Sequence, residues 1–76
     1  MARVYLLVNV LPGRDATVRD TLRGIKGVAT ADVVTGHYDI ISMIEANSAD
    51  EIFEKVLTKI RRIKGINRTE TFVAIE

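Results

Sequence analysis

The apolar and charged positions of the chain follow nearly the same order twice, at residues 22–28 and 60–66. Each copy is an amphipathic stretch that ends in Lys-Gly and is followed at once by a β-branched residue. Glycine suits the left-handed backbone position just past a helix end, and β-branched residues favour strands. The repeat therefore predicts, in each half of the chain, a helix that stops at a glycine and leads into a strand.

Apolar segments bounded by turn-forming or helical sequence predict four β-strands, at residues 4–11, 28–34, 40–46 and 66–75. The first segment is apolar on both of its faces, which is typical of a strand in the centre of a sheet. The second carries Thr30 and Asp32, and these polar residues favour a position at the sheet edge.

The first predicted helix covers residues 16–26, with Asp15 as its N-cap. Val18, Leu22 and Ile25 recur at the spacing of a single helix face, so we expect them to point toward the core.

The second predicted helix covers residues 49–64 and begins with a capping box. Ser48 and Glu51 stand three positions apart, so that each side chain can satisfy the backbone N–H of the other. The apolar face of this helix comprises Ile52, Phe53, Val56, Leu57, Ile60 and Ile63.

The predicted order of elements is β-α-β-β-α-β, within one domain that spans residues 1–76. Right-handed crossovers convert this order into a four-stranded antiparallel sheet with both helices on one face, an α+β fold of the ferredoxin-like sandwich type. The other face of the sheet carries apolar residues and has no helix to cover it. Because an apolar face of that size is unusual on a monomer, we expect sheet-against-sheet homodimers, a dimeric α+β barrel.

Composition narrows the possible functions. A chain of 76 residues buries only about 60% of its unfolded surface on folding, so oligomerisation would add needed stability. A net charge of +1, spread over interleaved acidic and basic residues, is unlike the footprint of a nucleic-acid-binding protein. The longest apolar run, residues 4–8, is too short to span a membrane, and no secretory signal pattern is present. We therefore expect a soluble, cytoplasmic protein.

The sequence offers little catalytic chemistry. It has no cysteine, a single histidine, no glycine-rich phosphate loop and no recognisable Ser-His-acid arrangement. We therefore expect no catalytic residues, no metal site and no cofactor, and the chain is predicted not to be an enzyme. The basic run at residues 61–64 could contact a phosphate group, but a solvated helix end accounts for it better.

One segment breaks the internal repeat, the loop Thr35-Gly36-His37-Tyr38-Asp39 between the second and third predicted strands. A plain turn explains its glycine and its carboxylate, but does not require an aromatic ring and an imidazole as well. Loops of this kind on a rigid sheet commonly hold a small ligand, and the two interpretations are evenly balanced. For His37 alone, an exposed loop histidine is the better interpretation.

Residues 34–40 and 63–71 together resemble the effector domain of the leucine-responsive and asparagine-operon regulators, the Lrp/AsnC family. The shared features are a Gly-x-Tyr-Asp turn and a Gly-x-x-Arg-Thr-Glu-Thr approach to the last strand. The resemblance extends over essentially the whole chain. This effector domain is called RAM, for regulation of amino-acid metabolism.

The resemblance implies a βαββαβ fold and dimers whose sheets face one another, with further assembly into rings that are octamers or decamers. It also implies an amino-acid effector held in clefts between neighbouring dimers. The ligand-binding positions of the family correspond here to Gly36, His37, Tyr38, Asp39, Thr69 and Thr71, with His37 at a variable position. Loop N–H groups would receive an α-carboxylate, Asp39 would pair with an α-ammonium, and the threonine hydroxyls would complete the polar shell.

Full-length regulators of this family carry an N-terminal helix-turn-helix domain, whereas this sequence starts directly in the first predicted strand. The resemblance therefore implies a stand-alone RAM domain that does not bind DNA by itself. Such a domain could sense an amino acid, co-assemble with a full-length regulator, or do both. Two alternatives share the topology. One is a small dimeric α+β barrel enzyme of monooxygenase or isomerase type, in which His37 would be catalytic or bind haem, and the other is an ACT-type amino-acid-binding domain.

Overall fold

The computed structural model describes residues 1–75, whose elements follow the order β-α-β-β-α-β. The strands are β1 (Ala2–Val10), β2 (Val28–Val33), β3 (Ile40–Ala46) and β4 (Ile66–Val73). The helices are α1 (Asp15–Arg23), and a second helix made of α2 (Ala49–Glu51), a π-helical segment (Ile52–Val56) and α3 (Leu57–Ile60).

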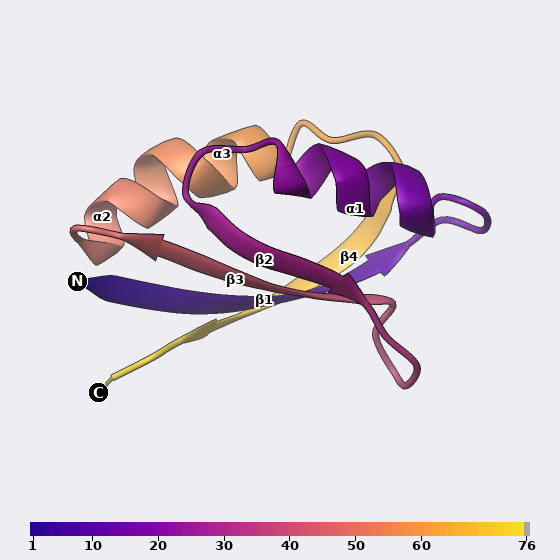
Figure 1. The fold of residues 1–76 in the computed structure, drawn as a ribbon, viewed down its shortest axis with the longest axis horizontal. Helices are drawn as coiled ribbons and strands as arrows, with labels where there is room; N and C mark the ends of the chain where they lie inside the picture. The colour runs from indigo at the N-terminus through magenta and orange to yellow at the C-terminus, as the bar shows by residue number, and fades with distance from the viewer. Residues whose placement is uncertain (76) are drawn as a thin grey trace.

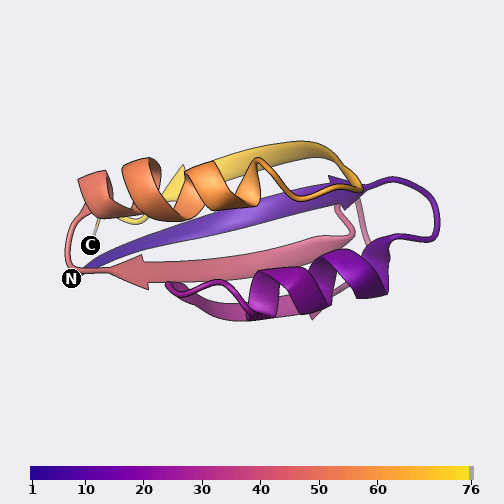
Figure 2. The same ribbon diagram turned by 90° about the horizontal axis from the view of Figure 1, so that it is seen from above.

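The four strands form one antiparallel sheet in the order β2-β3-β1-β4, and both helices lie on the same face of it (Figure 1). Seen from above, α1 lies on the β2 and β3 side of the sheet, and the second helix lies on the β1 and β4 side (Figure 2). The predicted central position of β1 and edge position of β2 are confirmed. The predicted α+β, ferredoxin-like sandwich is confirmed as well.

The core lies between the sheet and the helices, where alternate strand residues point inward. Val4, Leu6 and Val8 of the central strand β1 are at most 1% exposed. The other buried apolar residues are Val18, Leu22, Ala31, Ile40, Ile44, Ile52, Val56, Leu57 and Ile60. Ser42 is buried among them, and its Oγ donates a 2.8 Å hydrogen bond to the Thr30 carbonyl, which satisfies the hydroxyl.

The first helix is shorter than its apolar spacing predicts. It runs from Asp15 to Arg23, and Arg14 rather than Asp15 is the N-cap, without a side-chain capping bond. Past Arg23 the chain makes tight turns in which a backbone N–H donates a hydrogen bond to the carbonyl oxygen three residues earlier. Ile25 N, for example, donates to Leu22 O at 3.0 Å. Such bonds often replace the last helical turn, and hydrophobic spacing does not distinguish them from a continuing helix.

The second helix begins where predicted and ends early. Ser48 is its N-cap, and the Ser48 hydroxyl accepts a 3.1 Å hydrogen bond from Glu51 N. The helix ends at Ile60 instead of Lys64, because the residues that follow again form turns with hydrogen bonds to the carbonyl oxygen three residues earlier.

A π-helical segment within the second helix shifts its apolar face. Val56 and Leu57 are both buried although they are adjacent in sequence, whereas Phe53 is 40% exposed. A π-helical turn holds an extra residue and so changes which side chains point inward. The prediction that Phe53 shares the core-facing side is therefore wrong.

Gly27 allows the turn before β2 to pack closely against the second helix. Its φ of 104° is a left-handed conformation that glycine adopts without strain. A Cβ at this position would lie 2.8 Å from Cγ2 of Val56, closer than side-chain carbons pack. Its repeat counterpart Gly65 has a φ of 101° in the turn before β4. The predicted left-handed glycines are confirmed, although each lies a few residues past its helix end.

Candidate functional site

The loop of residues 34–39 joins β2 to β3 and projects from the sheet on the side away from the helices (Figure 1). A hydrogen bond from Val34 N to Asp39 O at 2.9 Å closes its base. Gly36, with a φ of 138°, and His37 are both exposed in this loop. The loop therefore presents its side chains to solvent on the helix-free side of the sheet.

Asp39 anchors this loop to β1. Its backbone N donates to Val8 O, and its Oδ2 accepts a hydrogen bond from Val10 N, both at 2.9 Å. The second bond falls where the pairing of β1 with β4 shifts register between Asn9 and Val10, so the carboxylate serves a backbone N–H at a β-bulge. The pairing of Asp39 with a ligand ammonium remains a prediction, and one of its carboxylate oxygens already has a role in the fold.

Tyr38 connects the loop to β4. Its hydroxyl donates a 2.5 Å hydrogen bond to Glu70 Oε1. That hydrogen bond, with some desolvation and the negative charge of Glu70, raises the pKa of Tyr38, while the charge of Arg68 opposes the shift. The phenol is thus held as a neutral donor, and this contact fixes the loop relative to the edge strand.

The loop is also held by Asn9, a residue that belongs to none of the motifs found in the sequence. Asn9 Nδ2 donates a 2.9 Å hydrogen bond to His37 O. Asn9, His37, Tyr38 and Arg68 line an open hollow of about 350 Å³. The sequence did contain a signal, because Asn9 is the one polar residue within the predicted first strand, residues 4–11.

Thr69 and Thr71 lie on the helix side of β4, opposite to the side that the loop contacts. They pair with Val8 and Leu6, whose side chains are buried beneath the helices, so the threonine side chains point toward the helical layer. They line a cleft of about 220 Å³ between α3 and β4, which we call the α3–β4 cleft. Glu70, which lies between them, points to the other face, where it bonds to the loop.

The predicted ligand-binding residues therefore form two groups in one chain. The loop carries Gly36, His37, Tyr38 and Asp39, and the α3–β4 cleft carries Thr69 and Thr71. Neither the cleft nor the hollow beside the loop is lined by residues of both groups, although Arg68 borders both. Two groups on opposite faces of one strand favour a site that combines the loop of one copy with the cleft of another.

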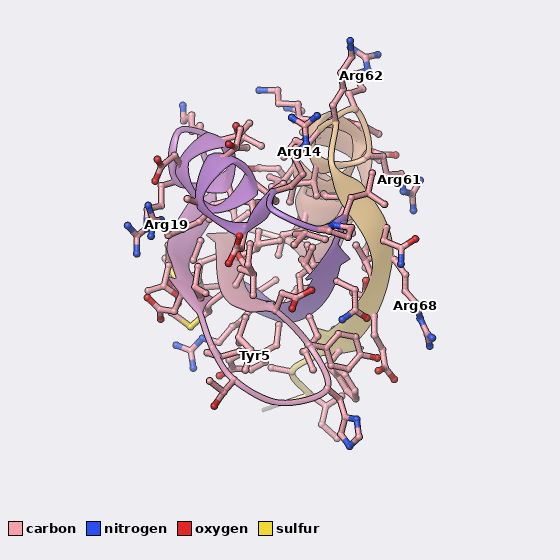
Figure 3. The ribbon with its side chains drawn as sticks, turned by 90° about the vertical axis from the view of Figure 1, so that its right-hand side faces the viewer. Tyr5, Arg14, Arg19, Arg61, Arg62 and Arg68 are labelled. Atoms are coloured by element: carbon pink, nitrogen blue, oxygen red, sulfur yellow. The ribbon has the colours of Figure 1, made fainter. Side chains whose placement is uncertain are left out.

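The sheet face opposite the helices, which we call the uncovered face, has an apolar centre. This centre is formed by Tyr5, Leu7, Ile41, Met43 and Phe72. Tyr5, Ile41 and Phe72 are 37%, 40% and 48% exposed, and Figure 3 shows Tyr5 on the side of the sheet away from the helices. Charged side chains surround the centre, among them the ion pair of Arg3 with Glu45 at 3.1 Å. An apolar centre with a polar rim is the usual layout of a protein–protein interface.

Residues 1–75 contain neither a metal-binding cluster nor a membrane-spanning helix. No three His, Cys, Asp or Glu side chains of this part of the chain come together in a way that could hold a metal ion. None of its helices has the length and apolar character that crossing a bilayer requires.

Comparison with known proteins points to one family. The sequence profile described as the Lrp/AsnC ligand binding domain matches residues 3–76. An uncharacterized HTH-type transcriptional regulator of Pyrococcus furiosus is 35% identical over 73 residues, which are 92% of this chain and 49% of that regulator. The crystal structure of a hypothetical protein from Pyrococcus horikoshii has a TM-score of 0.91 at 29% identity, covering 100% of this chain and 92% of that one.

A likeness to E. coli AsnC shows the shared fold. Its structure has a TM-score of 0.88 at 22% identity, and the similarity covers 99% of this chain and 51% of the AsnC chain. The chain described here spans about half the length of the curated regulators that it matches.

Proposed function

The chain belongs to the Lrp/AsnC ligand-binding domain family, and from this premise we propose that it is a regulatory, non-enzymatic domain that binds a small amino acid between copies of itself. Dimers would form through the uncovered face and assemble further into rings. The observation that carries this proposal is the division of the predicted ligand-binding residues into two groups on opposite sides of β4.

The uncovered face supports dimerisation as the first step of assembly. Its apolar side chains lie in adjacent register on β3, β1 and β4, so they form one continuous patch. Burying such a patch against a second copy removes apolar area from water, which is the main favourable term in protein association. A small domain gains stability from that burial that its own core does not supply.

The loop and the α3–β4 cleft supply complementary parts of a ligand site. The loop offers polar groups, including the neutral Tyr38 hydroxyl and the backbone around Gly36. The cleft offers apolar side chains together with the hydroxyls of Thr69 and Thr71. Small-molecule sites usually combine an apolar lining with a few polar groups, and subunit interfaces are frequent places for them.

A role in transcription regulation follows from the relatives, which are named as HTH-type regulators about twice as long as this chain. If the uncovered face is similar in those regulators, this chain can pair with them as it pairs with itself. We therefore include co-assembly with a full-length regulator in the proposal. Co-expression with such a regulator is expected to yield mixed oligomers, and strictly separate homo-oligomers would count against co-assembly.

Amino-acid binding is tested by a thermal-shift panel of the twenty amino acids. A ligand that binds only the folded protein at about one hundred times its Kd stabilises it by about 2.7 kcal/mol. We expect at least one small amino acid to raise the melting temperature by several degrees. A flat response across the panel at millimolar concentration contradicts the sensing role and leaves only assembly.

A further inference from the structure

The α3–β4 cleft has an apolar floor. Five side chains form it, namely Leu6, Leu57, Ile60, Ile63 and Ile66. The first three belong to the core and are at most 4% exposed, and the other two are half-buried against it. A floor without polar side chains accepts an aliphatic ligand tail, because the tail then leaves water without losing a hydrogen bond. The volume of about 220 Å³ suits a tail of the size of an amino-acid side chain.

The rim of the same cleft is polar and positively charged. It consists of Arg61, Asn67, Arg68, Thr69 and Thr71, and no Asp or Glu lines the cleft. Figure 3 shows the Arg61 and Arg68 side chains on the outer side of β4. The ion pairs within residues 1–75 involve other residues, so neither guanidinium is neutralised by a carboxylate of this part of the chain.

These rim groups favour a carboxylate and disfavour an ammonium. A guanidinium presents several N–H donors in a planar fork that matches the two oxygens of a carboxylate, and threonine hydroxyls can add further donors. A ligand ammonium at the same rim would meet the like charge of Arg61 and no acidic side chain. Asp39 does not line this cleft, and its Oδ2 already accepts a hydrogen bond from Val10 N.

We infer that the α3–β4 cleft recognises small apolar monocarboxylates by their tail and carboxylate. The 2-oxo acid of an aliphatic amino acid therefore binds with an affinity similar to that of the amino acid itself. Arg61 is the residue that holds the carboxylate, and the apolar floor holds the tail. The inference rests on the proposed function and names the ligand class of its site. Such a domain would respond to both the amino acid and the keto acid that transamination interconverts.

The test uses three probes that share one branched tail, each titrated into the assembled protein by calorimetry. Leucine has the carboxylate and the ammonium, 4-methyl-2-oxopentanoate has the carboxylate alone, and 3-methylbutylamine has the ammonium alone. We expect leucine and the oxo acid to bind with Kd values within about tenfold of each other. We expect no measurable binding of the amine.

Two neighbouring arginines provide a matched pair of variants. Arg61→Gln removes the cleft guanidinium, and we expect it to weaken both leucine and the oxo acid by about tenfold or more. Arg62→Gln removes the same charge one position along, from a side chain that does not line the cleft and that projects away from the sheet in Figure 3. We expect Arg62→Gln to leave both affinities unchanged.

The outcomes separate this inference from the proposed function. Binding of leucine without binding of the oxo acid shows that the ammonium is required, which overturns the inference while amino-acid sensing stands. Equal losses in the two arginine variants overturn it as well, because a general charge effect would then explain the carboxylate preference. Responses in the amino-acid panel confined to polar or charged amino acids, with no binding of leucine or its oxo acid, also overturn only the inference. If no amino acid of the panel and none of the three probes binds, both proposals fail.

Discussion

At the residue scale, three side-chain contacts hold the loop of residues 34–39 on the sheet. The Asp39 carboxylate binds the backbone of β1, the Asn9 amide binds the backbone of His37, and the Tyr38 hydroxyl binds Glu70 of β4. The aromatic ring and the carboxylate that suggested a ligand site are thus used in part by the fold itself. What the loop leaves for a ligand is its exposed backbone around Gly36, the His37 ring and the remaining lone pairs of the Tyr38 hydroxyl and the Asp39 carboxylate.

The hydrogen bond between Tyr38 and Glu70 predicts a shifted titration. It raises the pKa of Tyr38 in the folded protein above the ordinary value of about 10. The bond therefore contributes stability that is complete below the ordinary pKa and is lost as the pH rises through the folded pKa. Titration of ¹³C-labelled tyrosine by NMR, with Tyr38→Phe to assign the signal, is expected to show the raised pKa.

Removing the acceptor checks the cause of this shift. In Glu70→Ala the pKa of Tyr38 is expected to fall toward its ordinary value, because the bond and the nearby negative charge are both gone while Arg68 remains. A Tyr38 pKa that stays raised in Glu70→Ala would show that another contact holds the phenol.

At the element scale, the order of strands and helices could be predicted from the alternation and spacing of apolar residues. The bounds of β3, for example, agree with the prediction of residues 40–46. The helix ends could not be predicted, because residues such as Ile25 and Ile63 keep the apolar spacing while forming turns with bonds three residues back. The π-helical segment could not be predicted either, because no sequence signal marks the extra residue that changes which side chains point toward the core.

The two halves of the candidate site also differ in how far the sequence reveals them. Alternation along β4 places Thr69 and Thr71 on one face and Glu70 on the other once the register is known. The contacts of Asp39 with β1 and of Tyr38 with β4 join residues about thirty positions apart. They depend on strand pairing in three dimensions, which residue spacing does not encode.

Packing between the turn before β2 and the second helix predicts a large effect at Gly27. Gly27→Ala adds a left-handed strain of about 1–2 kcal/mol and an overlap with Val56 of about 1–3 kcal/mol, so we expect a loss of about 2–5 kcal/mol in unfolding free energy. Gly13→Ala is the control, because Gly13 has a φ of 79° but no neighbouring atom within 4 Å of its Cβ position. We expect about 1–2 kcal/mol there.

Urea denaturation of both glycine variants at one protein concentration measures these losses. The fixed concentration is needed because the stability of an oligomer depends on it. Equal losses in the two variants would mean that the overlap of the added Cβ with Val56 costs no free energy beyond the backbone strain.

At the scale of the whole molecule, the two surfaces of the sheet have different proposed tasks. The uncovered face pairs two copies, while the edge strand β4, with the loop on one side and the α3–β4 cleft on the other, remains available to a neighbouring dimer. All of β4 after Ile66 is exposed in one chain. A long exposed edge of this kind is usually paired or covered in the native assembly.

Assembly through the uncovered face predicts that one charge at its centre separates the copies. Ile41→Glu would place an unpaired carboxylate in the interface of each copy and is expected to weaken dimerisation by about 3 kcal/mol or more. Val33→Glu is the control, since Val33 has nearly the same exposure, 41% against 40%, but lies on the other face of the sheet. Sedimentation velocity is expected to show monomers for Ile41→Glu and the wild-type oligomer for Val33→Glu, and the reverse or no difference would contradict this interface.

A ligand site shared between copies is tested most directly by mixing two variants that each lack one half of it. Tyr38→Ala impairs the loop, and the double variant Thr69→Ala/Thr71→Ala impairs the cleft, so each protein alone is expected to lose binding of the amino acid found in the thermal-shift panel. The measurement is calorimetric titration of that amino acid into a mixture refolded or co-expressed together. Recovered binding, at the sites where an intact loop meets an intact cleft, is the predicted result. A mixture that binds no more than the separate variants would contradict a site built between copies.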